Sequence, residues 1–406
     1  MKKTALLIIA LVGVGSVLVP GGAGAVDLFN TNIVGAANTT TSDAWVISDT
    51  TAANYVITNS TISASNGNVR AWIASPTNGP FASLGRGGLM YNPTRQKDMI
   101  VTDSTITGSD GGNMTVVSNV IGGFKFFADG GDGMLLKNVN GVFNNAEIAG
   151  GNGGTIIAPY AGRSTADAGF GLKLQGTSTL HATNSIFKGG IGGEMTTPPT
   201  TTGDAVGGAG IVIEDRTTFA LDFSDDTQVI GGDGGSVSVQ EAYPGKANGG
   251  HALSVNAKSG TTTLTINGGR FVGGKAGTIA GQTMQAGKSI YVTGYGRANL
   301  TLEGGKFDDG ILIANYADST LALKSTFTND APLLFQGETL KITEWNDGQL
   351  SDVRLSGVNV VSIELAGTNE FNLSGSFIVG GNGRAIFSSG LVVKSGGTLE
   401  LGITPI

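Results

Sequence analysis

A repeat of about 42 residues constrains the fold of this chain more than any other feature of its sequence. Each copy places an apolar residue shortly before a glycine-rich stretch, and these anchor residues are Ile62, Ile106, Ile148, Phe187, Val229, Phe271 and Phe307. Three residues before every anchor stands Asn, Asp or Gly, the residue types that tolerate the left-handed backbone of a tight turn. Such a chain folds by stacking its units, because each unit buries its apolar face only against its neighbours.

Short runs of alternating apolar and polar residues precede the anchors, and a period of two is typical of β-strands. Leu180 and Ala182 form one such pair before Phe187, and the triplet 172–174 lies about 15 residues before the same anchor. Two copies are less regular, one with Gly141 at a paired position and one, at Leu221, with its pair a residue early. We therefore predict three short strands in every unit, joined by turns.

The step from Phe307 to Phe327 is only 20 residues, because the glycine-rich stretch is missing there. Three strands in a step of this size match one turn of a parallel β-helix, so the longer units are the same turn with an insert at one corner. We predict an all-β, right-handed parallel β-helix of about ten coils, each of roughly 20 residues, since parallel crossovers are predominantly right-handed. The alternative is a β-sandwich or a propeller, but neither deletes half a repeat while keeping its phase.

The predicted inserts lie near 63–88, 107–133, 149–170, 188–209, 230–251 and 272–288. We expect them to project from a single corner of the β-helix. Each should be removable at little cost, because closing a shorter loop costs less entropy.

The first 25 residues have the pattern of a signal peptide. Lys2 and Lys3 precede an apolar run from Ala5 to Val19, and an A-x-A cleavage site ends at Ala25. The run is shorter than the stretch of about 18 residues that a membrane-spanning helix needs. We expect a signal peptide at 1–25, a β-helix with inserted loops at 26–331, and less regular coils of the same β-helix at 332–406.

The composition agrees with an exported β-protein. The chain has 68 Gly among 406 residues, but these come in doublets and lack the three-residue period of collagen. A hydrophobic content of 40% with 14% charged residues is enough to bury a core, which argues against a disordered chain. The net charge of −7 disfavours nucleic acid as a partner, and the absence of Cys excludes disulfides and thiolate metal sites.

The inserts begin with G-G-x-G-G or a close variant, as at 150–154, 189–193, 231–235 and 273–277. A calcium-binding nonapeptide would need Asp at the sixth position, where this chain has Thr155, Glu194, Ser236 and Thr278. A phosphate-binding loop would need a following Lys-Ser/Thr and a helix. We therefore expect no metal ion and no cofactor, and we interpret the doublets as places where positive φ lets the chain leave and rejoin a crowded corner.

Adjacent carboxylates at Asp225–Asp226 and Asp308–Asp309 raise the alternative of glycoside hydrolysis, which needs two placed carboxyl groups. Asp226, however, occupies the turn position that Asn or Gly fills in other repeats. The Asn-Thr-Asp, Gly-His-Gly and Arg-Ile-Lys elements of polygalacturonase-like glycosidases are missing. His181 and His251 fall in different repeats, with no partner at triad or metal-ligand spacing. The sequence therefore assigns no catalytic residue.

Several inserts carry aromatic residues, namely Trp72, Phe81, Phe124, Phe126, Phe127, Tyr160 and Tyr243. On loops stacked along one edge, such side chains could form a platform for sugar rings or for a protein surface. The alternative is that they pack beneath their own loops. The candidates for ligand contact are Trp72, Phe81, Tyr160 and Tyr243.

The coils are rich in Gly, Thr, Ser and Asn and end in L-V-V-K-S-G-G-T-L-E-L at 391–401. Together with the signal peptide and the absence of Cys, this resembles the passenger region of a bacterial autotransporter or a related secreted β-helix surface protein. The resemblance implies export through an outer-membrane translocator, followed by adhesion or surface display. The sequence has no C-terminal run of about ten-residue amphipathic strands. We therefore expect a fragment of a longer protein, a chain anchored by a partner, or a released protein.

The expected function is binding without turnover, by a secreted or cell-surface protein associated with the outer membrane. Its partners would be carbohydrate or the surface of a host or neighbouring cell, with no nucleic acid bound and no membrane span in the mature chain. The alternative is a carbohydrate-active β-helix enzyme, a polysaccharide lyase or a glycosidase. An enzyme would gather acidic and basic side chains at one level of the rod, whereas an adhesin would spread its contacts along it.

Overall fold

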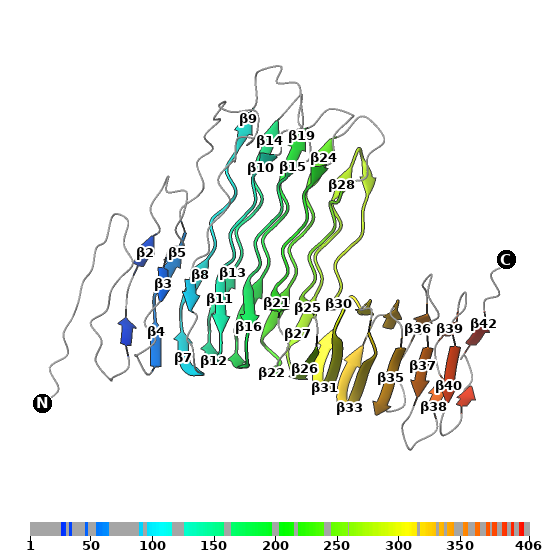
Figure 1. Ribbon diagram of the computed structural model, residues 1–406. Helices are drawn as coiled ribbons and strands as arrows, with labels where there is room; N and C mark the ends of the chain where they lie inside the picture. Colours follow the sequence, from blue (N-terminus) through cyan, green and yellow to red (C-terminus); the bar gives the residue numbers. More distant parts are fainter. Residues whose placement is uncertain are drawn as a thin grey trace, which may run out of the picture.

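The computed structural model describes residues 26–29, 32–34, 45–47, 54–64, 89–91, 96–115, 126–157, 164–196, 203–214, 218–238, 245–258, 260–314, 317–329, 333–336, 339–344, 352–355, 362–365, 371–373, 376–379, 384–387, 391–393 and 398–401. The regular secondary structure of these residues is all β, with no helix among them. Their strands pair in parallel, apart from one short hairpin. They stack coil upon coil into a parallel β-solenoid (Figure 1).

The body of the solenoid has three faces. The first face is a sheet of twelve strands: β3 (Trp45–Ile47), β6 (Leu89–Tyr91), β11 (Met134–Lys137), β16 (Leu172–Gln175), β21 (Ile211–Glu214), β25 (Leu253–Ala257), β30 (Ile290–Gly294), β32 (Ile311–Ile313), β34 (Leu333–Phe335), β36 (Asp352–Leu355), β39 (Ser376–Val379) and β42 (Thr398–Leu401). The second face follows it in each coil: β1 (Val26–Phe29), β4 (Asn54–Thr58), β7 (Lys97–Thr102), β12 (Val139–Asn144), β17 (Ser178–Thr183), β22 (Thr218–Phe223), β26 (Thr261–Asn267), β31 (Arg297–Phe307), β33 (Ser319–Asn329), β35 (Thr339–Glu344), β37 (Ser362–Leu365) and β40 (Arg384–Phe387).

The third face consists of β2 (Asn32–Val34) and the short strands that carry the first six anchors. These short strands are β5 (Thr61–Ser63), β8 (Thr105–Thr107), β13 (Glu147–Ala149), β18 (Ile186–Lys188), β23 (Gln228–Ile230) and β27 (Arg270–Val272), and the last pairs with the end of β31. Two further strands, β38 (Phe371–Leu373) and β41 (Leu391–Val393), pair with each other near the C-terminus.

The alternation read from the sequence decides which side chains enter the core. In β26, Thr262, Leu264 and Ile266 are buried, while the threonines between them point outward. This is the two-residue period of a strand with one face on a core. The core of the body is therefore a column of apolar ladders.

The anchor residues form one inward ladder, as predicted. Register pairs join Ile62, Ile106, Ile148, Phe187, Val229, Phe271 and Phe307 in that order, and all seven are fully buried. Ring contacts strengthen this ladder: the centroids of Phe271 and Phe307 are 4.9 Å apart, and the ring of Phe187 lies 5.3 Å from that of Phe143 on the second face. Aromatic contacts at these separations add to the free energy gained by burial alone.

The predicted turn geometry holds at five of the seven units. Residues with positive φ precede the anchors at Asn59, Asp103, Asn145, Asn184 and Gly268. The prediction is wrong at Asp226, because the turn between β22 and β23 is one residue longer and takes another form. It is also wrong at Gly304, where β31 continues and positive φ falls on Gly305. The longer turn explains why Leu221 lies a residue early yet stays in register with Leu180.

The coil after Phe307 has no insert, as predicted, and β32 begins at Ile311. Phe327 is not the register partner of Phe307, although a step of 20 residues relates the two in the sequence. Phe327 pairs with Gly305, and Phe307 pairs with Asn329, because the register between β31 and β33 shifts after Leu302. The sequence pattern contained no sign of this irregularity.

The solenoid continues toward the C-terminus, as the alternation predicted. On the first face β34, β36, β39 and β42 extend the sheet, and on the second face β35, β37 and β40 do the same. The described residues place twelve strands on the first face, one for each turn, where about ten turns were expected.

Candidate functional site

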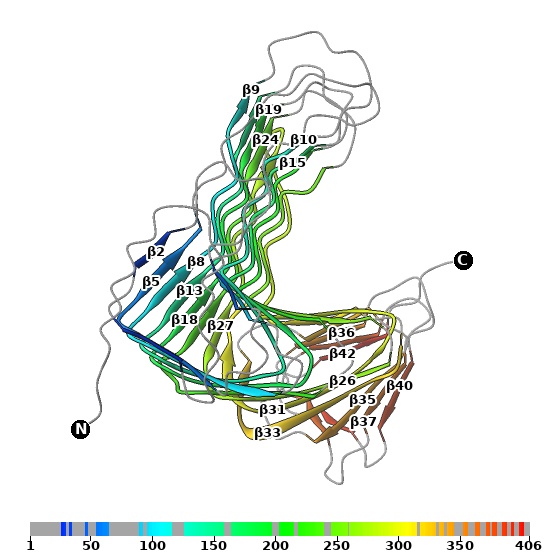
Figure 2. The same cartoon turned by 60° about the vertical axis from the view of Figure 1, so that its left-hand side comes forward.

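The glycine-rich inserts form one arm that projects from a single corner of the body, between its third and first faces (Figure 2). Its outer sheet contains β9 (Met114–Thr115), β14 (Thr155–Ile157), β19 (Glu194–Thr196), β24 (Ser236–Ser238), β28 (Thr278–Ile279) and β29 (Gln282–Thr283), and its inner sheet contains β10 (Phe126–Phe127), β15 (Ser164–Thr165) and β20 (Gly203–Asp204). The single corner was predicted correctly for the described inserts. Residues 65–88 of the first predicted insert lie outside the described residues.

The arm has a hydrophobic core of its own. It consists of Phe126, Ala128, Ile156, Ala166, Met195, Ala205, Val237 and Ala247, and it is separate from the core of the body. Each insert therefore packs on its neighbours in the stack and is no independent loop.

Between the body and the arm core, each described insert runs out along one leg and back along another. In the unit of Ile148, Gly150 and Gly153 donate hydrogen bonds of 2.9 and 2.8 Å to the outgoing leg of the next unit. Gly151 and Gly154 donate bonds of 2.8 and 2.7 Å to the returning leg of the preceding unit. Donors to each neighbouring leg thus recur every three residues, the period of a polyproline II helix, in which N–H groups are left for partners outside the helix.

Outgoing and returning legs alternate in one continuous column of hydrogen bonds. In this column the N–H of a glycine on each leg donates to a carbonyl on the preceding leg, at 2.7–3.0 Å. The column begins at the carbonyl of Ser109 and continues through Gly131, Gly151, Gly169, Gly190, Gly208, Gly232, Gly250, Gly274 and Gly287. The base of the arm is thus a bundle of glycine-rich legs joined by their backbones.

The interpretation that the doublets supply positive φ is wrong. Among the described residues, the glycines with positive φ are Gly176, Gly260, Gly268, Gly269, Gly281, Gly294, Gly305 and Gly310, and none belongs to a G-G-x-G-G motif. Close packing requires glycine instead. A Cβ on Gly232 would lie 1.7 Å from the carbonyl oxygen of Gly190, and one on Gly151 would lie 1.8 Å from that of Ser109. No side chain fits between legs this close.

The variable residue of the motif faces away from the bundle, and where it is Asp or Asn its side chain accepts a backbone hydrogen bond from the next unit. Asp110 accepts from the N–H of Asn152 at 2.7 Å, and Asn152 accepts from Ile191 at 2.8 Å. Asp233 accepts from Lys275 at 2.8 Å in the same way. These Asp and Asn side chains accept hydrogen bonds from the N–H groups that have no partner in the leg-to-leg backbone bonds.

The outer sheet of the arm presents two rows of outward-facing side chains, which lie two residues apart along each strand. Register pairs align the first row as Thr155, Glu194, Ser236 and Thr278, and the second as Ile157, Thr196 and Ser238. We call these seven residues the outer arm face. Ile157 is 43% exposed, whereas the alternate residues of the same strands enter the arm core. The sixth-position residues of the motif therefore form a regular polar surface.

The four aromatic candidates for ligand contact, Trp72, Phe81, Tyr160 and Tyr243, lie outside the described residues. Among the other insert aromatics, Phe126 is described and only 3% exposed, in the core of the arm. For Phe126 the alternative of packing beneath its own loop is therefore confirmed.

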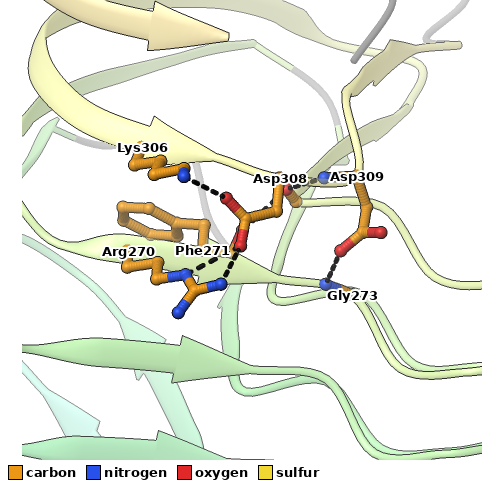
Figure 3. A network of polar contacts seen from close by, with 7 residues as sticks. Arg270, Phe271, Gly273, Lys306, Asp308 and Asp309 are labelled. Atoms are coloured by element: carbon orange, nitrogen blue, oxygen red, sulfur yellow. Dashed lines mark hydrogen bonds and ion pairs between the residues drawn. The ribbon is translucent and has the colours of Figure 1, made fainter. Parts of the chain in front are cut away.

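The Asp308–Asp309 pair closes the end of the arm at the first coil that lacks an insert (Figure 3). Asp309 accepts a 2.7 Å hydrogen bond from the N–H of Gly273. In earlier units the glycine at this position donates to the next insert, as Gly231 does to Val272. Asp308 Oδ2 lies 2.6 Å from the guanidinium of Arg270. Asp309 thus replaces a contact of the missing insert, while Asp308 forms ion pairs with Arg270 and, at 3.7 Å, with Lys306.

The Asp225–Asp226 pair is exposed in the longer turn between β22 and β23. A contact that sequence reasoning missed lies beside it on the second face. His181 Nδ1 is 3.0 Å from Asp222 Oδ2, and Asn267 donates to Asp222 Oδ1 at 3.0 Å. Asp222 lies one repeat after His181 in the sequence, and stacked coils place repeat-equivalent residues side by side. The repeat spacing alone could therefore have predicted this contact.

A mixed aromatic and charged patch lies where the returning legs enter the first face. We call it the elbow patch and define it as Phe170, Lys173, Glu214, His251, Lys258 and Tyr291. Its centre is a register row on β16, β21, β25 and β30, namely Lys173, Val212, Ser254 and Tyr291, of which Val212 is buried and the other three are partly exposed. Sequence reasoning missed this patch too, because its members come from four different repeats.

Glu214 joins two lysines in the elbow patch. Its Oε2 lies 3.1 Å from Lys173 Nζ and 3.3 Å from Lys258 Nζ. Burial alone would raise the pKa of Glu214, but the hydrogen bonds and positive charge of Lys173 and Lys258 outweigh it and lower that pKa. Lys173 Nζ also lies 5.8 Å from the centre of the Phe170 ring, within reach of a cation–π attraction.

His251 stacks on Tyr291, with ring centroids 4.3 Å apart. Burial, with a smaller contribution from the charge of Lys288, lowers the pKa of His251 from 6.5 to about 4. The ring is therefore neutral at pH 7. Its Nδ1 accepts a 2.9 Å hydrogen bond from the backbone N–H of Lys288, so the proton resides on Nε2.

The described part of the chain contains no group of three or more His, Asp or Glu side chains that could hold a metal ion. It also contains no helix long and apolar enough to cross a membrane. A scan against protein-family models, a search of curated proteins and a search of solved structures each found no match for this chain.

Proposed function

We propose that this protein is an exported, non-enzymatic β-solenoid of the cell surface, which contacts its partner through the outer arm face. The observation that carries the proposal is the stacking of the inserts into one arm with its own core. Because the legs at its base are hydrogen-bonded to one another, the arm holds the outer arm face away from the body. The same outward positions recur on successive strands about 4.8 Å apart.

Repetition favours binding by many weak contacts. Contacts made by identical positions on successive coils add when one partner meets them together, so avidity replaces a single strong site. The acidic pairs are consistent with this role, since Asp309 closes the arm, Asp308 is paired with Arg270, and Asp225 and Asp226 lie in an exposed turn. The proposal includes the passenger-like export inferred from the signal peptide.

The test is attachment of beads coated with the mature chain to bacterial and host cells. The variant Thr196→Lys with Ser238→Lys adds charge to the outer arm face at two exposed positions. Its matched control, Thr183→Lys with Thr261→Lys, changes two exposed threonines on the second face. We expect attachment to fall in the first variant alone, with both melting temperatures unchanged. Equal attachment by both variants would contradict the proposal.

A polysaccharide screen separates binding from turnover. Reducing ends or unsaturated products that appear with the native chain and vanish in Asp225→Asn with Asp226→Asn would establish a lyase or a glycosidase instead. We expect neither product, and we expect attachment of that double variant to stay near native.

A further inference from the structure

We propose that the elbow patch binds an acidic polysaccharide, whose chain runs along the solenoid axis across β16, β21, β25 and β30. This surface belongs to the first face of the body and does not depend on the outer arm face. It would give the protein a second, chemically distinct contact.

The first support is an excess of positive charge. Lys173 and Lys258 share one carboxylate, that of Glu214, and Lys288 lies nearby beside His251, within a chain of net charge −7. The side chain of Lys258 is 59% exposed despite its contact with Glu214. Lys288 has no carboxylate within ion-pair distance in the described part of the chain. A ligand with regularly spaced negative charges therefore finds ammonium groups that the protein itself does not neutralise.

The second support is the placement of the rings. Phe170 lies beside Lys173 at one end of the patch, and the His251–Tyr291 stack lies at the other. All three rings are half-buried, so each keeps one accessible edge or face while the solenoid fixes its orientation. The apolar C–H faces of sugar rings pack on aromatic rings, and rigid rings lose little entropy on binding.

The third support is the spacing. The row from Lys173 to Tyr291 crosses three strand steps, about 14 Å in all. One step is close to the rise of one sugar in an extended polysaccharide, so successive sugars can meet successive coils. A uronic acid chain carries one negative charge per sugar and fits both the lysines and the rings. Duplex DNA carries a much denser charge, which the acidic remainder of this protein repels.

The test is isothermal titration calorimetry of the mature chain with polygalacturonate, with neutral galactan and duplex DNA titrated in parallel. We expect binding of polygalacturonate alone, weakened by added salt. Lys258→Gln with Lys288→Gln should lower the affinity by about tenfold or more. The matched control is Lys275→Gln, because Lys275 occupies the outward position on the outgoing leg of the same insert as Lys288. It should bind as the native chain does.

A second variant tests the rings. Tyr291→Ser should weaken polygalacturonate binding without changing its salt dependence, since it removes a stacking surface and no charge. No binding by the native chain, equal binding of galactan or DNA, or equal loss in the Lys275→Gln control would each overturn the proposal. The Thr196→Lys, Ser238→Lys variant should keep full polygalacturonate binding. The experiments can therefore contradict the role of the outer arm face in attachment and the role of the elbow patch in polysaccharide binding independently.

Discussion

The body and the base of the arm belong to the same repeats but are held together by different forces. In the body, the anchor ladder fills the interior with Ile, Val and Phe side chains that are fully buried. In the base of the arm, the legs approach so closely that a Cβ would meet a carbonyl oxygen at about 2 Å at many glycines. The body is stabilised by apolar burial, and the arm base by backbone hydrogen bonds. The body should therefore be sensitive to lost volume, and the arm base to added volume.

The largest effect expected is loss of volume in the body. Phe187→Ala removes a buried ring that packs on Phe143 and Phe223, and should lower the free energy of unfolding by about 3 to 5 kcal/mol. Chemical denaturation followed by circular dichroism measures the change. Ile100→Ala, at a site 37% exposed, is the control and should cost far less. Equal costs at the two sites would show that apolar burial does not dominate the body.

The junction of the two regions should respond to acid through His251. Its pKa is about 4 in the folded protein and 6.5 ordinarily, so between these values the unfolded chain binds more protons than the folded one. Stability is complete above pH 6.5 and falls as the pH drops toward 4, by at most ~3 kcal/mol. His251→Gln should remove this part of the pH dependence in denaturation curves. His181→Gln, at an exposed site, should leave this pH dependence intact. An identical pH profile of stability for the native and His251→Gln proteins would show that His251 does not cause it.

Added volume in the arm base should come next. Gly232→Ala places a Cβ 1.7 Å from the Gly190 carbonyl oxygen and should cost about 2 kcal/mol. Amide hydrogen exchange should show lost protection in the legs while the anchor strands stay protected, because the arm and the body have separate cores. Gly281→Asn is the control, since its φ of +80° suits Asn and no atom lies within 4 Å of a new Cβ. Loss of protection throughout the chain would mean that the two regions unfold together.

The smallest effect expected is at the end of the arm. Asp309→Ala leaves the N–H of Gly273 without its acceptor and should cost about 1 to 2 kcal/mol. The exposed double variant Asp225→Asn, Asp226→Asn should stay within about 0.5 kcal/mol of the native protein. Thermal unfolding of the two variants measures the contrast. A larger effect from the exposed pair would contradict the assignment of Asp309 as the residue that closes the arm.

The body was predictable because its two determinants are local. The alternation of apolar and polar residues predicted that Leu180 and Phe187 lie in the core, and the turn residues Asn145 and Asn184 predicted the left-handed corners. The register shift after Leu302 was not predictable, since it depends on how two long strands pair rather than on either sequence alone.

The arm was only half predictable. The G-G-x-G-G motif correctly indicated crowding, but its three-residue period was not recognised as the period of an extended leg. The prediction that inserts can be removed singly stays untested, and the hydrogen bonds that Gly190 and Gly232 make with adjacent legs now argue against it in the middle of the arm. The contacts of the elbow patch could not be predicted from the sequence, because they join residues that only the stacking of coils brings together.

The alternating column of leg-to-leg bonds has a consequence for the order in which the arm is assembled. Gly151 on an outgoing leg bonds to Gly131 on the returning leg of the preceding unit, and Gly169 on its own returning leg then bonds to Gly151. Every leg thus docks on a template completed immediately before it in the chain. The arm can therefore grow vectorially from the N-terminal side, one leg at a time, without waiting for distant segments.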